Sequence, residues 1–222
     1  MENVLIGKIA VMKVKVINMK SIIKYELALL LLFISIAVNA SNSGGKNPEQ
    51  VVVQMQSSLI QAMKDGEKLG YDGRLKFLEP VIKQSHDMEL IIKTILGATY
   101  WAQLDNEQKK LITNTFKELS VATYASRFAQ YEGEQFDVVE QRDLPHEQKL
   151  VRSQLTKSDG GTVNFDYVLH PTEAGWRIVN ILFDGVSDLA IKRGEYRAVM
   201  QRDGFPALIE LLKEKITAAR QP

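Results

Sequence analysis

The sequence predicts an α+β fold in which helices come first, a four-stranded antiparallel meander follows, and helices end the chain. Apolar residues recur every three or four positions between residues 48 and 131, and every second position between residues 136 and 170. Short turn sequences, of which Ser158-Asp159-Gly160-Gly161 is the clearest, separate the predicted strands. About six helices packed on one face of the sheet account for most other residues, and this arrangement can enclose an apolar pocket.

Capping residues and glycines set the predicted helix boundaries. Asn47-Pro48 and Asp87 are typical of helix starts. Asn and Asp side chains accept hydrogen bonds from the free N–H groups of the first turn, and Pro has no N–H that needs a partner. Gly70 and Gly97 are expected to end two of the helices. The predicted helices span residues 48–69, 72–77, 88–96, 106–131, 187–202 and 204–219.

The predicted strands are short and bounded by turns. In the third, apolar residues occupy every second position from Val163 to Leu169 and therefore share one face. The fourth is apolar on both faces, which predicts a central or doubly covered strand. The strands are expected near residues 136–138, 150–155, 163–170 and 176–183.

Residues 1–40 are predicted to be a targeting segment. A basic stretch precedes an apolar run over residues 27–38, and small residues ending at Ala40 are typical of a signal-peptidase site. The run is shorter than the roughly 20 residues of a membrane-spanning helix. We expect a cleaved secretory signal, with Met19 as an alternative initiator, and a single domain over residues 41–222. An uncleaved N-terminal anchor is the other interpretation.

Composition excludes several function classes. Beyond residue 40 the chain carries 23 basic and 25 acidic side chains, and this near-neutral balance argues against nucleic acid as the main partner. The chain has no Cys, so we expect no lipoprotein anchor, no disulfide and no thiolate chemistry. The missing thiols also suit an oxidising compartment such as the periplasm.

Patterns typical of catalysis are absent from the sequence. His86, His146 and His170 are expected at turns or on the surface, and none has a second ligand at a metal-binding spacing. Asp184 and Ser187 are interpreted as helix caps rather than as catalytic groups. We therefore predict a protein that is not an enzyme and that uses no cofactor and no metal.

Two long segments, residues 96–136 and 176–216, carry a diffuse pattern that covers nearly all of the exported part. Its members are Leu96-Gly97, Asn106-Glu107-Gln108, Phe116, Tyr124, Tyr131, Gly133, Gly185-Val186-Ser187, Lys192, Glu195, Arg202 and Gly204. In this pattern the chain resembles the MlaC family of periplasmic lipid carriers, also called toluene-tolerance auxiliary proteins. Residues 70–74 and 121–128 resemble the hopanoid-associated branch, HpnM, more closely. The sequence departs from the MlaC pattern at Asp188, where an apolar residue is expected.

The resemblance implies a four-stranded sheet and surrounding helices that enclose a deep pocket for lipid tails. Members of the family shuttle phospholipid between an outer-membrane lipoprotein complex and an inner-membrane ABC transporter complex. The hopanoid-associated branch handles a polycyclic lipid instead. For this chain the resemblance therefore implies a periplasmic carrier of a phospholipid or a hopanoid, with these two complexes as its partners.

The candidate lipid-binding residues lie on two strand faces, the turn after them and the longest helix. Each is equally typical of an ordinary core, because periodicity does not distinguish a packed interior from a cavity. Two other functions therefore stay open: an adaptor with a solid core that docks on a membrane complex, and an enzyme acting on a small substrate. The candidates are Phe116, Leu119, Thr123, Val163, Phe165, Tyr167, Ile178, Asn180, Leu182, Val186 and Leu189.

Overall fold

The helices and strands follow the predicted order around one antiparallel sheet. The computed structural model describes residues 47–220, so the predicted signal segment lies outside the described residues. Within the described part, no helix is both long enough and apolar enough to cross a membrane. The elements are α2 (Pro48–Lys64), α3 (Gly66–Ser85), α4 (Met88–Gln103), α5 (Asn106–Arg127), β1 (Gln135–Asp143), β2 (Lys149–Thr156), β3 (Thr162–Thr172), β4 (Gly175–Phe183), β5 (Val186–Ser187) and α6 (Asp188–Ala219).

Capping boxes fix where α2 and α5 begin. The Asn47 side chain accepts a hydrogen bond from the Gln50 N–H (2.7 Å), and the Gln50 side chain accepts one from the Asn47 N–H (3.1 Å). Asp105 and Gln108 make the same reciprocal pair, at 2.8 and 3.1 Å. Each box satisfies amide groups that have no partner inside the helix. Both predicted helix starts are confirmed.

The helices before the sheet differ from the prediction at their ends. α2 stops at Lys64 instead of residue 69, and α5 stops at Arg127 instead of residue 131. The helix predicted over residues 72–77 is part of α3, which continues through Pro80 to Ser85. Because α3 packs against both α2 and α5, tertiary contacts outweigh the low helix propensity of proline here.

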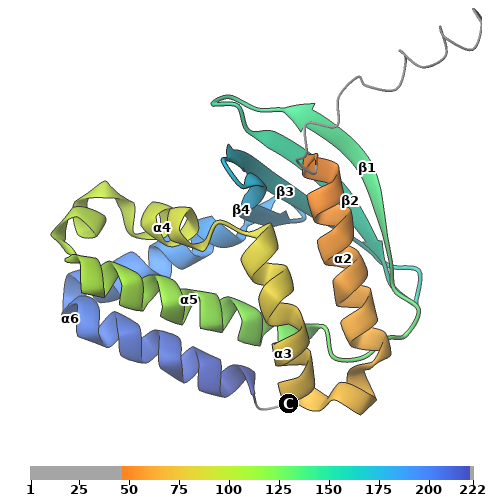
Figure 1. Cartoon of the computed structure of the whole chain (residues 1–222), viewed down its shortest axis with the longest axis horizontal. Helices are drawn as coiled ribbons and strands as arrows, with labels where there is room; N and C mark the ends of the chain where they lie inside the picture. Colours follow the sequence, from red (N-terminus) through yellow and green to blue (C-terminus); the bar gives the residue numbers. More distant parts are fainter. Residues whose placement is uncertain (1–46, 221–222) are drawn as a thin grey trace, which may run out of the picture. The chain divides into compact units, whose positions relative to one another are not determined.

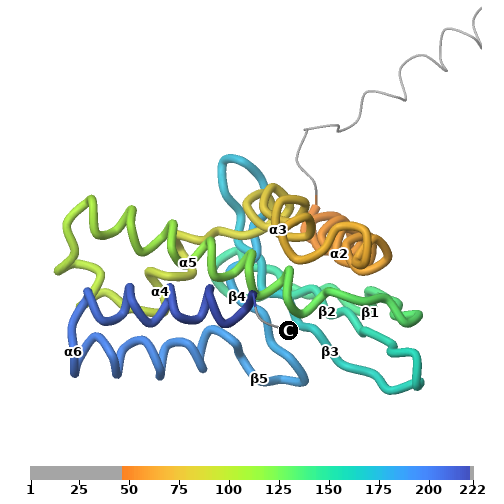
Figure 2. The backbone as a smooth tube through the Cα atoms, turned by 90° about the horizontal axis from the view of Figure 1, so that it is seen from below, coloured from red at the N-terminus to blue at the C-terminus, as the bar shows by residue number. Residues whose placement is uncertain are grey.

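Glycines interrupt α4 and α6 without ending them. Gly97 (φ 80°, ψ 167°) lies inside α4, which resumes and reaches Gln103. Gly204 (φ 82°, ψ −176°) divides α6 where the sequence predicts two separate helices. Figure 2 shows that the two halves of α6 run side by side in opposite directions. The helical layer beside the sheet is therefore built from α4, α5 and both halves of α6.

The sheet has five strands rather than the predicted four, in the order β1-β2-β3-β4-β5. The additional strand, β5, pairs with the end of β4 through a two-residue turn formed by Asp184 (φ 46°) and Gly185 (φ 83°). An Asp-Gly pair is a strong hairpin signal, but the strand that follows is only two residues long and merges into a helix cap. The prediction of Asp184 as a helix cap is wrong. Its carboxylate accepts from the Asn164 N–H (2.9 Å), while Ser187 alone caps α6.

The apolar face of the sheet packs on the helices. Figure 1 shows α2 lying along β1 and β2, with α4, α5 and α6 grouped beyond β4. Tyr167 and Leu169 on β3 point into the core that the helices cover. On the alternate positions, Asp166 pairs with Arg152 at 2.7 Å on the other side of the sheet. The strand alternation therefore separates a helix-covered apolar face from a charged one.

Candidate functional site

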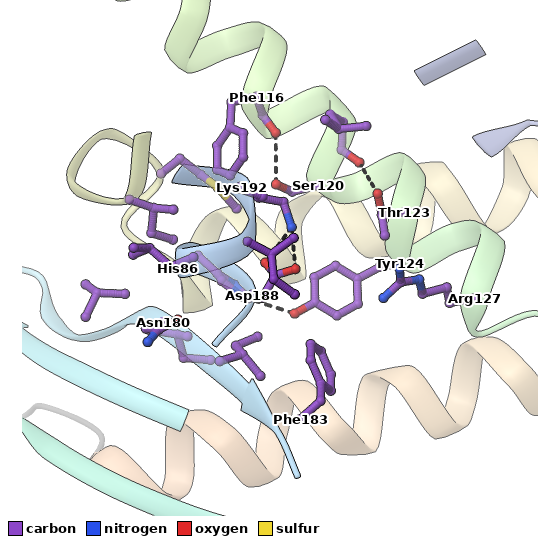
Figure 3. A pocket seen from close by; sticks show the side chains of 18 of the residues that line it. His86, Phe116, Ser120, Thr123, Tyr124, Arg127, Asn180, Phe183, Asp188 and Lys192 are labelled. Carbon is purple, nitrogen blue, oxygen red and sulfur yellow. Dashed lines mark hydrogen bonds and ion pairs between the residues drawn. The ribbon is translucent and has the colours of Figure 1, made fainter. Parts of the chain in front are cut away.

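A cavity of about 690 Å³ lies between α5, both halves of α6, and strands β3 and β4. Figure 3 shows side chains from these elements converging on it. Its wall is mainly apolar and aromatic, and a volume of this size is typical of a ligand site rather than a packing defect. The aliphatic and phenylalanine residues in the wall are Leu59, Met88, Ile91, Phe116, Leu119, Phe128, Phe165, Ile178, Val179, Ile181, Phe183, Leu189, Ile191 and Ala219.

Eight of the eleven predicted lipid-binding residues line this cavity. Helix α5 contributes three of them, β3 and β4 contribute four, and α6 contributes one. The structure places these residues around one cavity. Their contact with a lipid stays a prediction. The eight are Phe116, Leu119, Thr123, Phe165, Tyr167, Ile178, Asn180 and Leu189.

A β-bulge explains why Leu182 does not line the cavity. Asn180 lies opposite Val168, but Ile178 lies opposite Leu169, so the extra residue Val179 shifts the register of β4. Beyond the bulge, Leu182 is opposite Asp166 and therefore on the charged face of the sheet. Asn180 is on the same face, but it lies next to the bulge and still borders the cavity.

The same shift turns Ile181 and Phe183 toward the cavity, where they lie opposite Tyr167 and Phe165. Neither residue is among the predicted ones, because a strict two-residue period places both on the other face. A bulge has no reliable signature in one sequence, so only the strand pairing identifies them.

Val163 and Val186 also lie outside the cavity. Val163 is on the apolar face of β3, but it lies near the hairpin, opposite Leu155 of β2. Val186 follows the turn at Gly185 and is 56% exposed. The two-residue period places Val163 on the correct face, but its position near the hairpin is outside the cavity, whereas Val186 is outside it because its side chain is exposed.

His86 lines the cavity and is buried, so its prediction as a surface or turn histidine is wrong. It lies between α3 and α4, where the following residue, Asp87, donates its backbone N–H to the Ile178 carbonyl at 3.0 Å. This bond holds the connection against β4. Burial lowers the pKa of His86 to about 4, since a charged imidazole is poorly solvated there. The ring is therefore neutral at pH 7.

Hydrogen bonds on both sides of His86 define which nitrogen carries the proton. Ser85 donates its hydroxyl hydrogen to the Val81 carbonyl (2.8 Å), so its oxygen can only accept from His86 Nδ1 (2.8 Å). The other nitrogen, Nε2, then accepts from the Tyr124 hydroxyl (3.3 Å; Figure 3). In this arrangement Ser85 is a structural acceptor and not an activated nucleophile.

Tyr167 supplies a second buried hydroxyl in the cavity wall. Its side chain is 1% exposed, and its oxygen accepts from the Gln56 amide on α2 at 3.2 Å. Burial raises the pKa of Tyr167, and burial also raises the pKa of Tyr124. Both phenols are therefore neutral hydrogen-bonding groups over the whole physiological pH range.

Charged side chains lie at the end of the cavity formed by α6. Asp188 pairs with Lys192 one helical turn later, and Glu195 pairs with Lys215 at 2.7 Å. Arg127, in the last turn of α5, also lines the cavity (Figure 3). Ile191 also lines the cavity although it is 60% exposed, so the cavity opens to solvent here.

Asp188, where the sequence departs from the family pattern, is therefore compatible with the cavity. Its carboxylate is neutralised by the Lys192 ammonium, and both lie where the wall meets solvent. An ion pair at this position leaves the apolar part of the wall intact. The described residues contain no cluster of three potential metal ligands.

The protein-family comparison matches residues 50–214 to the model described as MlaC protein. The chain belongs to the MlaC family. The matched MlaC region begins within α2 and ends within the second half of α6, so it includes all the strands and nearly all of the cavity wall. The observed sheet and cavity are consequently those of an MlaC-type domain.

Two known proteins are similar to this MlaC-family chain. The toluene tolerance protein ttg2D of Pseudomonas putida is 22% identical over 134 residues. That match spans 60% of this chain and only 60% of the relative. A solved structure of a phospholipid-binding protein from Ralstonia solanacearum, in complex with a phospholipid, has a TM-score of 0.69 at 19% identity. The structural match covers 79% of this chain and 100% of the Ralstonia solanacearum chain. At this identity the likeness shows a shared fold.

Proposed function

We propose that this MlaC-family protein is a periplasmic carrier that holds the apolar part of a lipid in the cavity between α5, α6 and the sheet. The observation that carries the proposal is the cavity itself, about 690 Å³ in volume with a largely apolar and aromatic wall. A solid-core adaptor would need no such space, because protein interiors are otherwise close-packed.

The physical need for a carrier comes from the hydrophobic effect. Each methylene exposed to water costs about 0.8 kcal/mol, so moving a chain of about 15 methylenes through water costs about 12 kcal/mol. A wall of aliphatic and aromatic side chains replaces the bilayer and removes most of this cost. No covalent step is required, which agrees with a site built from neutral hydroxyls and ion pairs.

Phospholipid is the ligand that the comparisons favour, because the similar structure from Ralstonia solanacearum contains one. A hopanoid is the alternative that the resemblance to the hopanoid-associated branch supports. In either case we propose that the protein is exported by its N-terminal segment. It would then transfer lipid between an inner-membrane ABC transporter complex and an outer-membrane lipoprotein complex.

Lipid extraction tests this proposal directly. The full chain is purified after expression in several hosts, and its organic extract is analysed by mass spectrometry with a molar standard. We expect about one lipid per chain, and its mass identifies phospholipid or hopanoid. Ile181→Glu places a charge in the cavity wall, where an unpaired carboxylate is poorly solvated. We expect it to reduce lipid content at least about tenfold.

Val186→Glu is the matched control, because it adds the same charge nearby at an exposed position outside the cavity. It should carry as much lipid as the unmodified chain. Full lipid content in Ile181→Glu would mean that the lipid binds elsewhere. Absence of lipid from every preparation would favour the adaptor, and lipid breakdown dependent on a titratable residue would indicate an enzyme.

A further inference from the structure

The cavity wall contains a buried hydroxyl with an unused hydrogen. The Tyr167 oxygen accepts a hydrogen bond from Gln56, an amide group that in this orientation can only donate. Among the described residues, this is the single hydrogen bond that the Tyr167 hydroxyl makes. Its own hydrogen therefore has no acceptor, although the side chain is only 1% exposed. Buried donors in proteins are normally paired.

The neighbouring polar groups do not supply that acceptor. Tyr124 donates to His86 at 3.3 Å. The hydroxyls of Ser120 and Thr123 donate to the carbonyls one turn earlier in α5, at 2.8 Å each. Their oxygens could accept a further bond, but none lies within bonding geometry of Tyr167. In the orientation that the structure gives, the nitrogen of the Gln56 amide, and not its oxygen, faces the Tyr167 hydroxyl.

We propose that the Tyr167 hydroxyl donates a hydrogen bond to an oxygen atom on the buried part of the lipid, such as an ester carbonyl or a hydroxyl. The inference rests on the proposed carrier function and adds a specificity-determining residue to it. A purely apolar wall would take any hydrocarbon of suitable size. A single buried donor discriminates between lipids that carry an oxygen at its level and lipids that do not.

The location of Tyr167 supports an oxygen within the apolar region and not in the charged head group. Tyr167 stacks on Phe165 with ring centroids 6.2 Å apart, and it lies opposite Ile181 on β4. The charged residues at the solvent end, such as Lys192 and Lys215, belong to α6 instead. A lipid whose head group meets those charges would place the first part of its buried region along β3 and β4.

Two pairs of lipids test the inference and separate the two oxygen sources. Delipidated full-length protein is titrated with a fluorescent phosphatidylcholine, which is then displaced by unlabelled lipid. The first pair is a diester and a diether phosphatidylcholine of equal chain length. The second is a pentacyclic triterpenoid alcohol and the corresponding hydrocarbon. We expect the unmodified protein to bind the oxygen-bearing member of at least one pair about threefold to tenfold more tightly.

Tyr167→Phe should remove this preference and bind both members of the pair like the weaker one. Tyr100→Phe is the control, because Tyr100 is on α4 outside the cavity, and it should keep the preference. If Tyr167→Phe folds poorly because Gln56 is left unpaired, the double variant with Gln56→Leu removes both groups.

Preference for the diester would identify an ester carbonyl as the acceptor, and preference for the alcohol would identify a hydroxyl. The inference is overturned if Tyr167→Phe keeps the preference, or if the unmodified protein binds both members of each pair equally. Failure of the unmodified protein to bind all four lipids would overturn the proposed carrier function as well.

Discussion

The burial of His86 makes the stability of the folded protein depend on pH. The ring lies between Ser85 and Tyr124, and burial lowers its pKa from 6.5 to about 4. In the unfolded chain the same histidine takes up a proton near pH 6.5. Between these two values the unfolded state binds one more proton than the folded state, so acid favours unfolding.

We predict that the free energy of unfolding falls by about 3 kcal/mol through His86 alone as the pH falls from 7 to 4. The stabilising contribution is fully present above pH 6.5 and is lost as the pH approaches the lowered pKa. Urea denaturation followed by circular dichroism at several pH values measures it. The His86→Phe variant should show a correspondingly shallower dependence on pH between 7 and 4, whatever its stability at pH 7.

His146 provides the comparison for this pH series. It is exposed in the loop between β1 and β2 and has a left-handed backbone (φ 60°), which asparagine tolerates. The His146→Asn variant should keep the pH dependence of the unmodified protein. An unchanged pH dependence in both variants would show that carboxylates, not His86, dominate acid unfolding.

At the scale of elements, the contact between α4 and α6 depends on one glycine. Arg197 on α6 donates to the Ile95 carbonyl at 2.8 Å, just before α4 is interrupted at Gly97. A Cβ at Gly97 would lie 2.1 Å from the Arg197 guanidinium, and the Gly97 backbone conformation (φ 80°) is one that other residues rarely adopt. The interruption therefore allows the arginine to reach a helix carbonyl that would otherwise lack a partner.

We predict that Gly97→Ala lowers the free energy of unfolding by about 2–3 kcal/mol, because it strains the backbone and displaces Arg197. Chemical denaturation at neutral pH measures the change. Gly194→Ala on α6 is the matched substitution, since Gly194 is helical and exposed with open space around its Cβ position. It should raise stability by about 0.5–1 kcal/mol. A similar loss in both variants would contradict the role assigned to Gly97.

Local sequence patterns predicted the elements better than their orientation. The helix starts at Pro48 and Asn106 follow from capping residues that act within a few positions of the chain. The bulge at Val179 depends on how β4 pairs with β3, and it decides that Ile181 rather than Leu182 faces the cavity. The pairing of two strands depends on residues far apart in the sequence. The two-residue period of one strand therefore does not show where the register of that pairing shifts.

For the whole molecule, the proposed binding of lipid in the cavity would make stability dependent on the ligand. An empty apolar space of about 690 Å³ leaves its wall without packing partners on one side. A lipid that binds the folded state alone stabilises it by mass action, by about 4 kcal/mol at a thousandfold excess over its dissociation constant.

We predict that removing the co-purified lipid lowers the melting temperature and that adding phospholipid vesicles restores it. Differential scanning calorimetry of the same preparation before extraction, after extraction and after lipid addition measures both changes. The Ile181→Glu variant should melt at one temperature with or without vesicles, because the charge excludes lipid from the cavity. Equal melting temperatures of loaded and extracted protein would show that the lipid does not occupy the fold's interior.

The sequence by itself determined the α+β order, the capped helix starts, the hairpin turns and eight of the side chains that line the cavity. These features depend on residue type and on spacing within one helix or strand, both of which are local. Only the tertiary structure decided that His86 is buried, that β4 bulges and gains β5 as a neighbour, and that space remains between the layers. A cavity is the volume that packed elements leave unfilled, so it exists only once α5, α6 and the sheet are in place.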